Sequence, residues 1–162
     1  MPRAKRVQAA GPRRAATRPA GLVLTVPSDT AFLSLVRDVT RKLGTLAGFP
    51  GATADRLALA VDECTTNVIR HAYRGQSGNA IELRFSPDGN EFRVEVLDDG
   101  EAVDPRAMPR VDLERYAAER RKGGLGVHLM GQLMDSVTYG RRSGRNVCRM
   151  IKRRPRAGRA QA

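Results

Sequence analysis

The chain has 162 residues, of which 41% are hydrophobic, enough for one domain with a buried core, although only 4% are aromatic and Trp is absent. It contains no run of about 18 apolar residues and no apolar segment typical of a secretory signal, so we expect a cytoplasmic protein that does not span a membrane. Cys64 and Cys148 are the only cysteines, which favours reduced thiols over a disulfide framework or a zinc site.

The formal net charge of +12 is distributed unevenly along the chain. Residues 1–20 carry six Lys or Arg and residues 141–162 carry nine, and neither segment contains an acidic residue. The residues between them hold 14 basic against all 17 acidic residues, a net charge of −3. Basic ends can bind nucleic acid non-specifically, but without interleaved aromatics they do not indicate sequence readout. A nucleic-acid-binding protein is therefore the least favoured interpretation.

Composition divides the chain into three segments. Residues 1–20 are rich in Pro, Ala and Arg without periodicity, which predicts a disordered basic arm. Residues 21–153 contain the periodic segments and form the predicted folded domain, and residues 154–162 form a basic tail. The domain is predicted to begin with a strand at Leu22–Val26, followed by a helix that Asp29 caps and that ends near Leu46.

Two hairpins are predicted in the second half of the chain. Apolar and polar residues alternate over 81–85 and 92–96, with the turn Ser86-Pro87-Asp88-Gly89-Asn90 between them. A second pair of strands is expected at Val137–Arg141 and Asn146–Lys152. With short connections and helices between them, these hairpins predict an α/β two-layer sandwich, in which a mostly antiparallel mixed sheet carries helices on one face.

The segment LALAVDECTTNVIRHAY, residues 57–73, is predicted to be the central helix, beginning at Thr53 or Asp55 and ending near Tyr73. At helical spacing its apolar residues form one stripe: Leu57, Val61, Cys64, Val68 and Ala72. A second face carries Glu63, Asn67, Arg70 and His71. Taken alone, this polar face is either a solvated surface or a functional one.

Two further segments are ambiguous when each is taken alone. Asp98-Asp99-Gly100 follows a predicted strand and could be a turn or a binding site. Gly123-Gly124-Leu125-Gly126 precedes a helix predicted over Val127–Met134. These glycines could be a hinge, or their N–H groups at the helix N-terminus could hold phosphate.

In this order the three segments resemble the motifs of the GHKL ATP-binding superfamily, and within it the bacterial anti-sigma-factor serine kinases. The resemblance covers Leu22–Lys152. Asp62–Tyr73 is similar to the N-box, Asp98-Asp99-Gly100 with Val103-Asp104-Pro105 to the first glycine box, and Gly123–Met130 to the second glycine box with its helix. The resemblance implies the Bergerat-type ATP-binding fold.

The resemblance also implies roles for individual residues. Glu63 would be the catalytic base, Asn67 would bind Mg²⁺ together with phosphates and water, and Asp98 would accept a hydrogen bond from the adenine amino group. Gly100 would let the backbone pass beneath the base, and residues 107–122 would form a lid. The implied ATP-binding residues are Asn67, Arg70, Asp98, Gly100, Gly123, Gly124, Leu125, Gly126 and Val127. Arg70 could equally be exposed without a role, and we interpret His71 and His128 as structural.

The function implied is that of an ATP-dependent serine protein kinase that phosphorylates an anti-sigma-factor antagonist and sequesters a sigma factor. A homodimer is also implied, through the first helix or a sheet edge. The alternative is an ATP-binding protein-interaction module with little or no kinase activity. Two features depart from the family pattern: Ala102 occupies a position where many members have glycine, and the Arg-rich arm at 1–20 has no counterpart in it.

Overall fold

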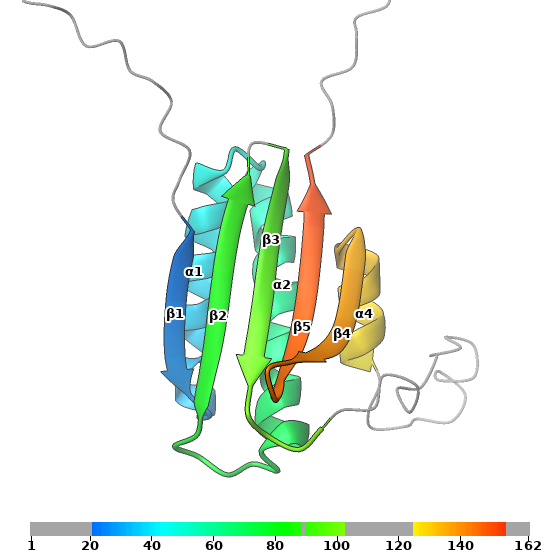
Figure 1. Ribbon diagram of the computed structural model, residues 1–162. Coiled ribbons are helices and arrows are strands. Elements are labelled where there is room, and N and C mark those ends of the chain that lie inside the picture. The colour runs from blue at the N-terminus through cyan, green and yellow to red at the C-terminus, as the bar shows by residue number, and fades with distance from the viewer. Residues whose placement is uncertain (1–20, 89, 103–124, 155–162) are drawn as a thin grey trace, which may run out of the picture.

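The computed structural model describes residues 21–88, 90–102 and 125–154, and these residues form two layers (Figure 1). One layer is a five-stranded sheet of order β1-β2-β3-β5-β4, in which every neighbouring pair is antiparallel. The strands are β1 (Leu22–Pro27), β2 (Ala80–Asp88), β3 (Glu91–Asp98), β4 (Ser136–Arg142) and β5 (Arg145–Arg153). The helices are η1 (Thr30–Phe32), α1 (Leu33–Leu46), α2 (Gly51–Asn67), η2 (Val68–Ala72) and α4 (Leu125–Leu133). The predicted two-layer α/β fold is confirmed.

The helices α1, α2 and α4 lie against one face of the sheet, as the alternation of the strands requires (Figure 1). Every second strand residue points toward them and is buried: Ile81, Leu83, Phe85, Phe92, Val94, Val96, Cys148 and Met150. The same alternation directs Asp98 and Asn146, which are paired in the β3–β5 register, toward the helical side. The helical layer therefore covers two polar residues at the end of an otherwise apolar face.

The central helix begins earlier than the sequence predicts, and its last turn is not α-helical. It begins at Gly51, and at Asn67 it changes to a π-helical turn, in which the N–H of Tyr73 donates to the carbonyl of Val68. The buried stripe is confirmed, from Leu57 to Ala72. The helical turns end at Ala72, next to the predicted end at Tyr73, but the last turn is π-helical and therefore wider than a regular α-helical turn. Such turns are frequent at functional sites.

Two further boundaries are corrected by the structure. Asp29 accepts a hydrogen bond from the N–H of Ala31, so it caps the 3-10 turn η1 that precedes α1. The first hairpin turn is shorter than the predicted Ser86–Asn90, because β2 continues to Asp88, which lies opposite Glu91. Pro87 is tolerated in β2 because β1 begins at Leu22, opposite Phe85, and does not reach Pro87, so the missing N–H of Pro87 costs no hydrogen bond on that side. No helix in the described ranges is both long and apolar enough to cross a membrane.

Candidate functional site

The polar face of α2 lies beneath the first turn of α4. At Gly126, the second residue of α4, an added β-carbon would collide with the Glu63 carboxylate and would lie 3.6 Å from Nδ2 of Asn67. Glycine is therefore what allows the backbone of α4 to approach these two side chains. Glu63 and Asn67 are one helical turn apart, so they face the same space. This contact joins the segment similar to the N-box to the segment similar to the second glycine box.

Asp98 is a buried carboxylate at the end of β3, with 3% of its surface exposed. Its Oδ1 accepts hydrogen bonds from the N–H of Gly100 at 2.9 Å and from Nδ2 of Asn146 at 2.8 Å. Burial raises the pKa of Asp98, whereas these two hydrogen bonds act in the opposite direction. Neither of these two hydrogen bonds uses Oδ2.

Asn146 is a site residue that the sequence reasoning missed. Besides its bond to Asp98, its Nδ2 lies 3.0 Å from the carbonyl oxygen of Glu101 and 3.3 Å from that of Gly100. The side chain is 6% exposed, and its Oδ1 makes no hydrogen bond within the described residues. Asn146 therefore holds both Asp98 and the backbone that follows it. The sequence did contain a signal for this role, because Asn146 is a polar residue at a position of the predicted strand that alternation directs toward the helices.

The end of the central helix is bound to the segment that follows β3. A β-carbon at Gly100 would lie 2.6 Å from the carbonyl oxygen of Ala72, and the N–H of Glu101 donates to that oxygen at 2.9 Å. The hydroxyl of Tyr73 accepts from the N–H of Asp99 at 3.0 Å and donates to the carbonyl of Ala80 at 2.7 Å. Gly100 thus has a packing role against the helix, which is separate from the role beneath a base that the resemblance implies.

These contacts place Gly126 beside Glu63 and Asn67 of α2, and Gly100 beside Asp98 and against Ala72 at the end of η2. Residues 26–152 match the family model of the histidine kinase-like ATPase domain. The chain belongs to this family. Membership confirms the resemblance to the GHKL superfamily and implies that the domain binds ATP.

Proteins with similar sequences include bacterial serine-protein kinases named RsbW. The chain is 28% identical to RsbW of Bacillus subtilis over 126 residues, and this aligned region covers 75% of this chain and 78% of that protein. It is 29% identical over 120 residues to RsbW of Listeria monocytogenes, covering 72% and 76% respectively. Among solved structures, the RsbU and RsbW domains of a Mycobacterium tuberculosis protein superpose with a TM-score of 0.59 at 16% identity, over 83% of this chain and 32% of that one. This last likeness concerns the fold alone.

The other residues singled out from the sequence lie in different surroundings. Arg70 and His71 are exposed on η2, and His128 contacts Gln132 on the surface of α4, with 2.9 Å between Nε2 of each side chain. Val127 packs against the hydrophobic core. Leu125 is the first residue of α4. Gly123, Gly124, the expected lid at 107–122 and Val103-Asp104-Pro105 lie outside the described residues.

Proposed function

We propose that this protein is an ATP-dependent serine protein kinase that phosphorylates a protein antagonist and also sequesters a sigma factor. The observation that supports this most strongly is the contact of Gly126 with Glu63 and Asn67. It places a carboxylate and a carboxamide beside the N-terminal turn of a helix, where backbone N–H groups and the helix dipole favour anions such as phosphate. The similarity to the RsbW serine-protein kinases supports the same assignment.

For the nucleotide base, the supporting feature is the environment of Asp98. With Oδ1 occupied by two donors, Oδ2 would accept a hydrogen bond from the exocyclic amino group of adenine. Guanine carries an oxygen at that ring position, and an acceptor there would face the carboxylate. A buried acceptor that lacks its donor costs about 1–3 kcal/mol, so Asp98 would favour ATP over GTP by a factor of about 5 to 150.

The residues present also fit a magnesium ion. Asn67 supplies a side-chain oxygen, the ligand type that Mg²⁺ prefers, and phosphate oxygens and water would complete the coordination. The Nδ2 of Asn67 is buried without a hydrogen-bond partner in the described residues, so nothing there fixes the carboxamide in another role. When bound, the ion would reduce the negative charge on the phosphates. We propose no other protein ligand.

In the transfer step, Glu63 would act as the general base. Its carboxylate would take the proton from a serine hydroxyl of the partner protein while the serine oxygen forms a bond to the γ-phosphorus. The bond from that phosphorus to the β,γ-bridging oxygen breaks, and ADP leaves with the electron pair. The protein would contribute mainly by positioning these groups and by stabilising the transferring phosphoryl group.

The decisive experiment compares Glu63→Gln with the wild-type chain. Each protein would be incubated with radiolabelled ATP, Mg²⁺ and a candidate antagonist, while ATP binding is measured by calorimetry. We expect the variant to bind ATP within about threefold of wild type and to lose at least about 100-fold in phosphoserine formation. Glu91→Gln, on the opposite face of the sheet, is the matched control. A variant that transfers phosphate at the wild-type rate would show that Glu63 is not the base.

The partners are part of the same proposal. Pull-down with ATP and with ADP should show exchange between a sigma factor and an unphosphorylated antagonist. If the wild-type chain binds ATP and exchanges partners without phosphorylating either, the nucleotide-gated interaction module becomes the better description. If calorimetry detects no ATP binding, both descriptions are excluded.

Self-association is also proposed. β1 is an edge strand of the sheet, and Leu22 and Val23 on it, with Leu35 on α1, expose apolar side chains. Both features are typical of a surface that is covered in an oligomer. We expect a homodimer through this edge. Sedimentation of the Val23→Lys variant, compared with that of wild type, would test it.

A further inference from the structure

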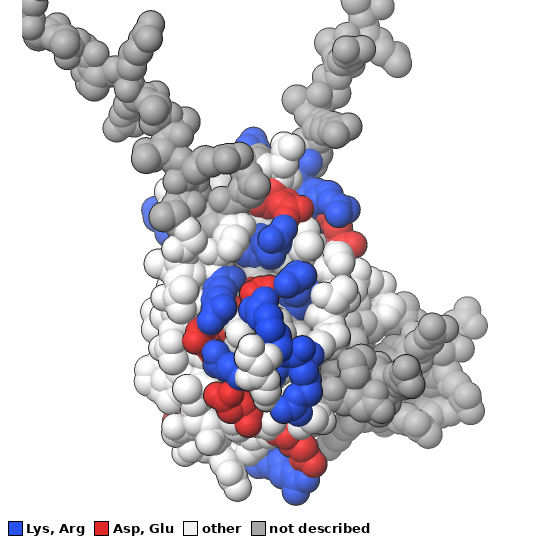
Figure 2. Space-filling model, in the orientation of Figure 1, with Lys and Arg blue, Asp and Glu red and all other residues white. Residues whose placement is uncertain are grey.

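The face of the sheet opposite the helices is not covered by any element in the described residues, and it is rich in arginine (Figure 1, Figure 2). Strand register identifies the outward-facing charged residues. Among the residues whose side chains are described, the basic ones are Arg84, Arg93, Arg142, Arg145, Arg149 and Arg153, and the acidic ones are Glu82, Glu91 and Glu95. Figure 2 shows the blue side chains gathered over the middle of this face. The face therefore carries more positive than negative charge.

The acidic side chains on this face are shared between arginines. Glu95 accepts hydrogen bonds from Arg142 at 2.9 Å and from Arg149 at 2.7 Å. Both bonds lower the pKa of Glu95, and the bond from Arg142 has the larger effect. Glu82 is shared in the same way by Arg84 and Arg145. Arg145 also pairs with Asp99 beyond the end of β3, at 3.2 Å. Each guanidinium group has five N–H donors. Two guanidinium groups that share one carboxylate therefore retain N–H donors for a further acceptor.

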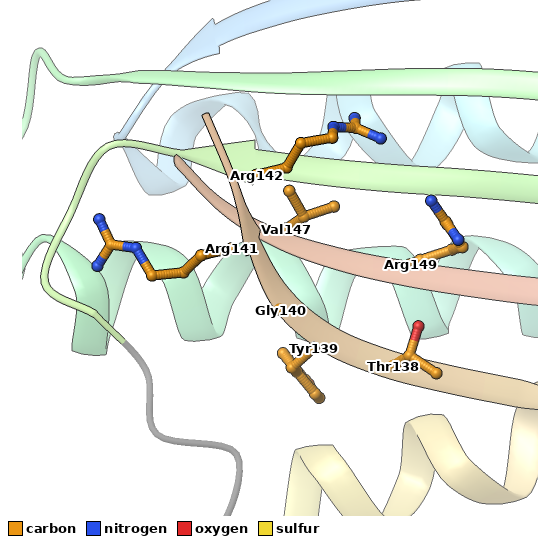
Figure 3. Close-up of a pocket in the computed structure, with 7 residues that line it drawn as sticks. All are labelled: Thr138, Tyr139, Gly140, Arg141, Arg142, Val147 and Arg149. Carbon is orange, nitrogen blue, oxygen red and sulfur yellow. The ribbon is translucent and has the colours of Figure 1, made fainter. Parts of the chain in front are cut away.

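A hollow of about 290 Å³ lies between β4 and β5 on this face (Figure 3). Val147 forms part of its lining, and a β-carbon added at Gly140 would have open space around it. Arg142, Val147 and Arg149 project to the same side in Figure 3, whereas Tyr139 projects to the other side, toward α4. The hollow thus combines a small apolar surface with three arginines, Arg141, Arg142 and Arg149.

The apolar residues beneath the arginines are unusually buried for an outward face. Leu97 is 2% exposed and Val147 is 8% exposed, although no described element covers them. Protein interfaces are enriched in arginine, and arginine side chains often cover apolar residues at their centres.

We propose that the outward face over β3, β4 and β5 docks an acidic segment of a partner protein. Carboxylates of the segment would bind Arg142 and Arg149, and one of its apolar side chains would enter the hollow at Gly140. Guanidinium groups bind carboxylates through paired, charge-assisted hydrogen bonds, which gives such a contact a defined geometry.

Two other occupants fit this face less well. Nucleic acid would gain little from it, because the described outward-facing positions of the strands include no aromatic side chain for base stacking, and Glu82, Glu91 and Glu95 would repel phosphates. A second copy packed face to face would bring the same excess of arginine together on both sides, which is unfavourable. An acidic protein segment meets neither objection.

The proposed docking surface is independent of the nucleotide site. Asp98 and the helices lie on the other side of the sheet, and none of the residues that line the hollow belongs to the ATP-binding set. Binding to this surface can therefore be measured without nucleotide. Its failure would leave the proposed kinase function untouched, and the converse also holds.

The test uses the full chain and a fluorescein-labelled 14-residue peptide of Glu and Leu, with binding followed by fluorescence anisotropy. The double variant Arg142→Glu/Arg149→Glu should weaken binding at least tenfold. The control Lys42→Glu/Arg56→Glu, on exposed helix positions, changes the net charge equally and should alter binding less than twofold. An equal loss in both double variants would show that the peptide responds only to overall charge, and it would overturn the proposal.

Gly140→Val tests the hollow without changing the charge. The added side chain has room in the unbound protein, so folding should be preserved while peptide binding falls at least threefold. Unchanged binding would remove the hollow from the proposal. A 16-base-pair DNA duplex could also be tested as a competitor. If it displaces the peptide from the wild-type chain and binds more weakly to Arg142→Glu/Arg149→Glu but not to the control double variant, the face is a nucleic-acid surface instead. A wild-type dimer that this double variant converts to monomer would identify it as a self-association surface.

Discussion

The backbone of Gly126 in α4 lies against the carboxylate of Glu63 in α2, and no side chain larger than hydrogen fits between them. The methyl group of Gly126→Ala should displace either the start of α4 or Glu63. We expect ATP affinity to fall at least tenfold and the free energy of unfolding to fall by about 1–3 kcal/mol, as for other overpacked sites.

The control for this variant is on the same helix. A β-carbon at Gly131 would have open space, so Gly131→Ala should leave ATP binding unchanged and raise stability by about 0.5–1 kcal/mol through helix propensity. Calorimetry and urea unfolding measure the two quantities. Equal ATP affinity in the two variants would show that close approach at Gly126 does not matter for the nucleotide.

Asp98→Asn should separate stability from binding. Asparagine can still accept the hydrogen bonds from Gly100 and Asn146, but it would present a donor to the adenine amino group, so ATP affinity should fall at least 100-fold. Because burial raises the pKa of Asp98, the folded state binds its proton more readily than the unfolded chain, and the ionised side chain lowers stability at neutral pH.

The stability difference between Asp98→Asn and wild type should therefore be largest near pH 7. It should shrink as pH falls through the raised pKa of Asp98, because protonation removes the cost of the buried charge from the wild-type protein. Urea unfolding of both proteins between pH 7 and pH 4 measures this difference. An advantage for the variant that grows on acidification would contradict the assignment.

Asn146→Ala should weaken nucleotide binding through Asp98. Removing Nδ2 leaves the Asp98 carboxylate with one donor fewer and frees the backbone at Gly100 and Glu101, for a loss of about 1–3 kcal/mol in stability. We expect the KM for ATP to rise at least tenfold with a smaller change in kcat, and the preference for ATP over GTP to decrease. Lower stability with unchanged nucleotide preference would mean that Asn146 only supports the fold.

Tyr73→Phe should loosen the connection between the central helix and the segment after β3. Its hydroxyl makes two hydrogen bonds, each contributing about 1 kcal/mol, and the amide of Asp99 should exchange hydrogen faster in the variant. Tyr139→Phe is the matched control, because its buried hydroxyl makes no hydrogen bond to a nitrogen or oxygen atom within the described residues and lies near the thiols of Cys148 and Cys64. Slower unfolding or unchanged exchange at Asp99 would contradict this role of Tyr73.

Several parts of the fold follow from local sequence patterns. Alternation over 81–85 and 92–96 predicts both strands and their buried faces, because a side chain's direction in a strand depends only on its parity. The stripe from Leu57 to Ala72 predicts the buried face of the central helix for a similar reason. The π-helical turn at Val68–Ala72 was not predicted, because its contacts with Gly100 and Glu101 join distant segments. The extension of β2 to Asp88 was not predicted either, because Pro87, Asp88 and Gly89 are typical turn residues, although Asp88 pairs with the nearby Glu91.

The sequence by itself determined which residues have the chemistry for a nucleotide site, together with the order of the motifs that contain them. Only the tertiary structure decided that Gly126 contacts Glu63 and that Asn146 holds Asp98, since these pairs are separated by 63 and 48 residues along the chain. Helix and strand periodicity act over a few residues, whereas the meeting of distant side chains depends on how the layers pack. The arginine face has the same origin, because strand order alone brings β2, β3 and β5 side by side.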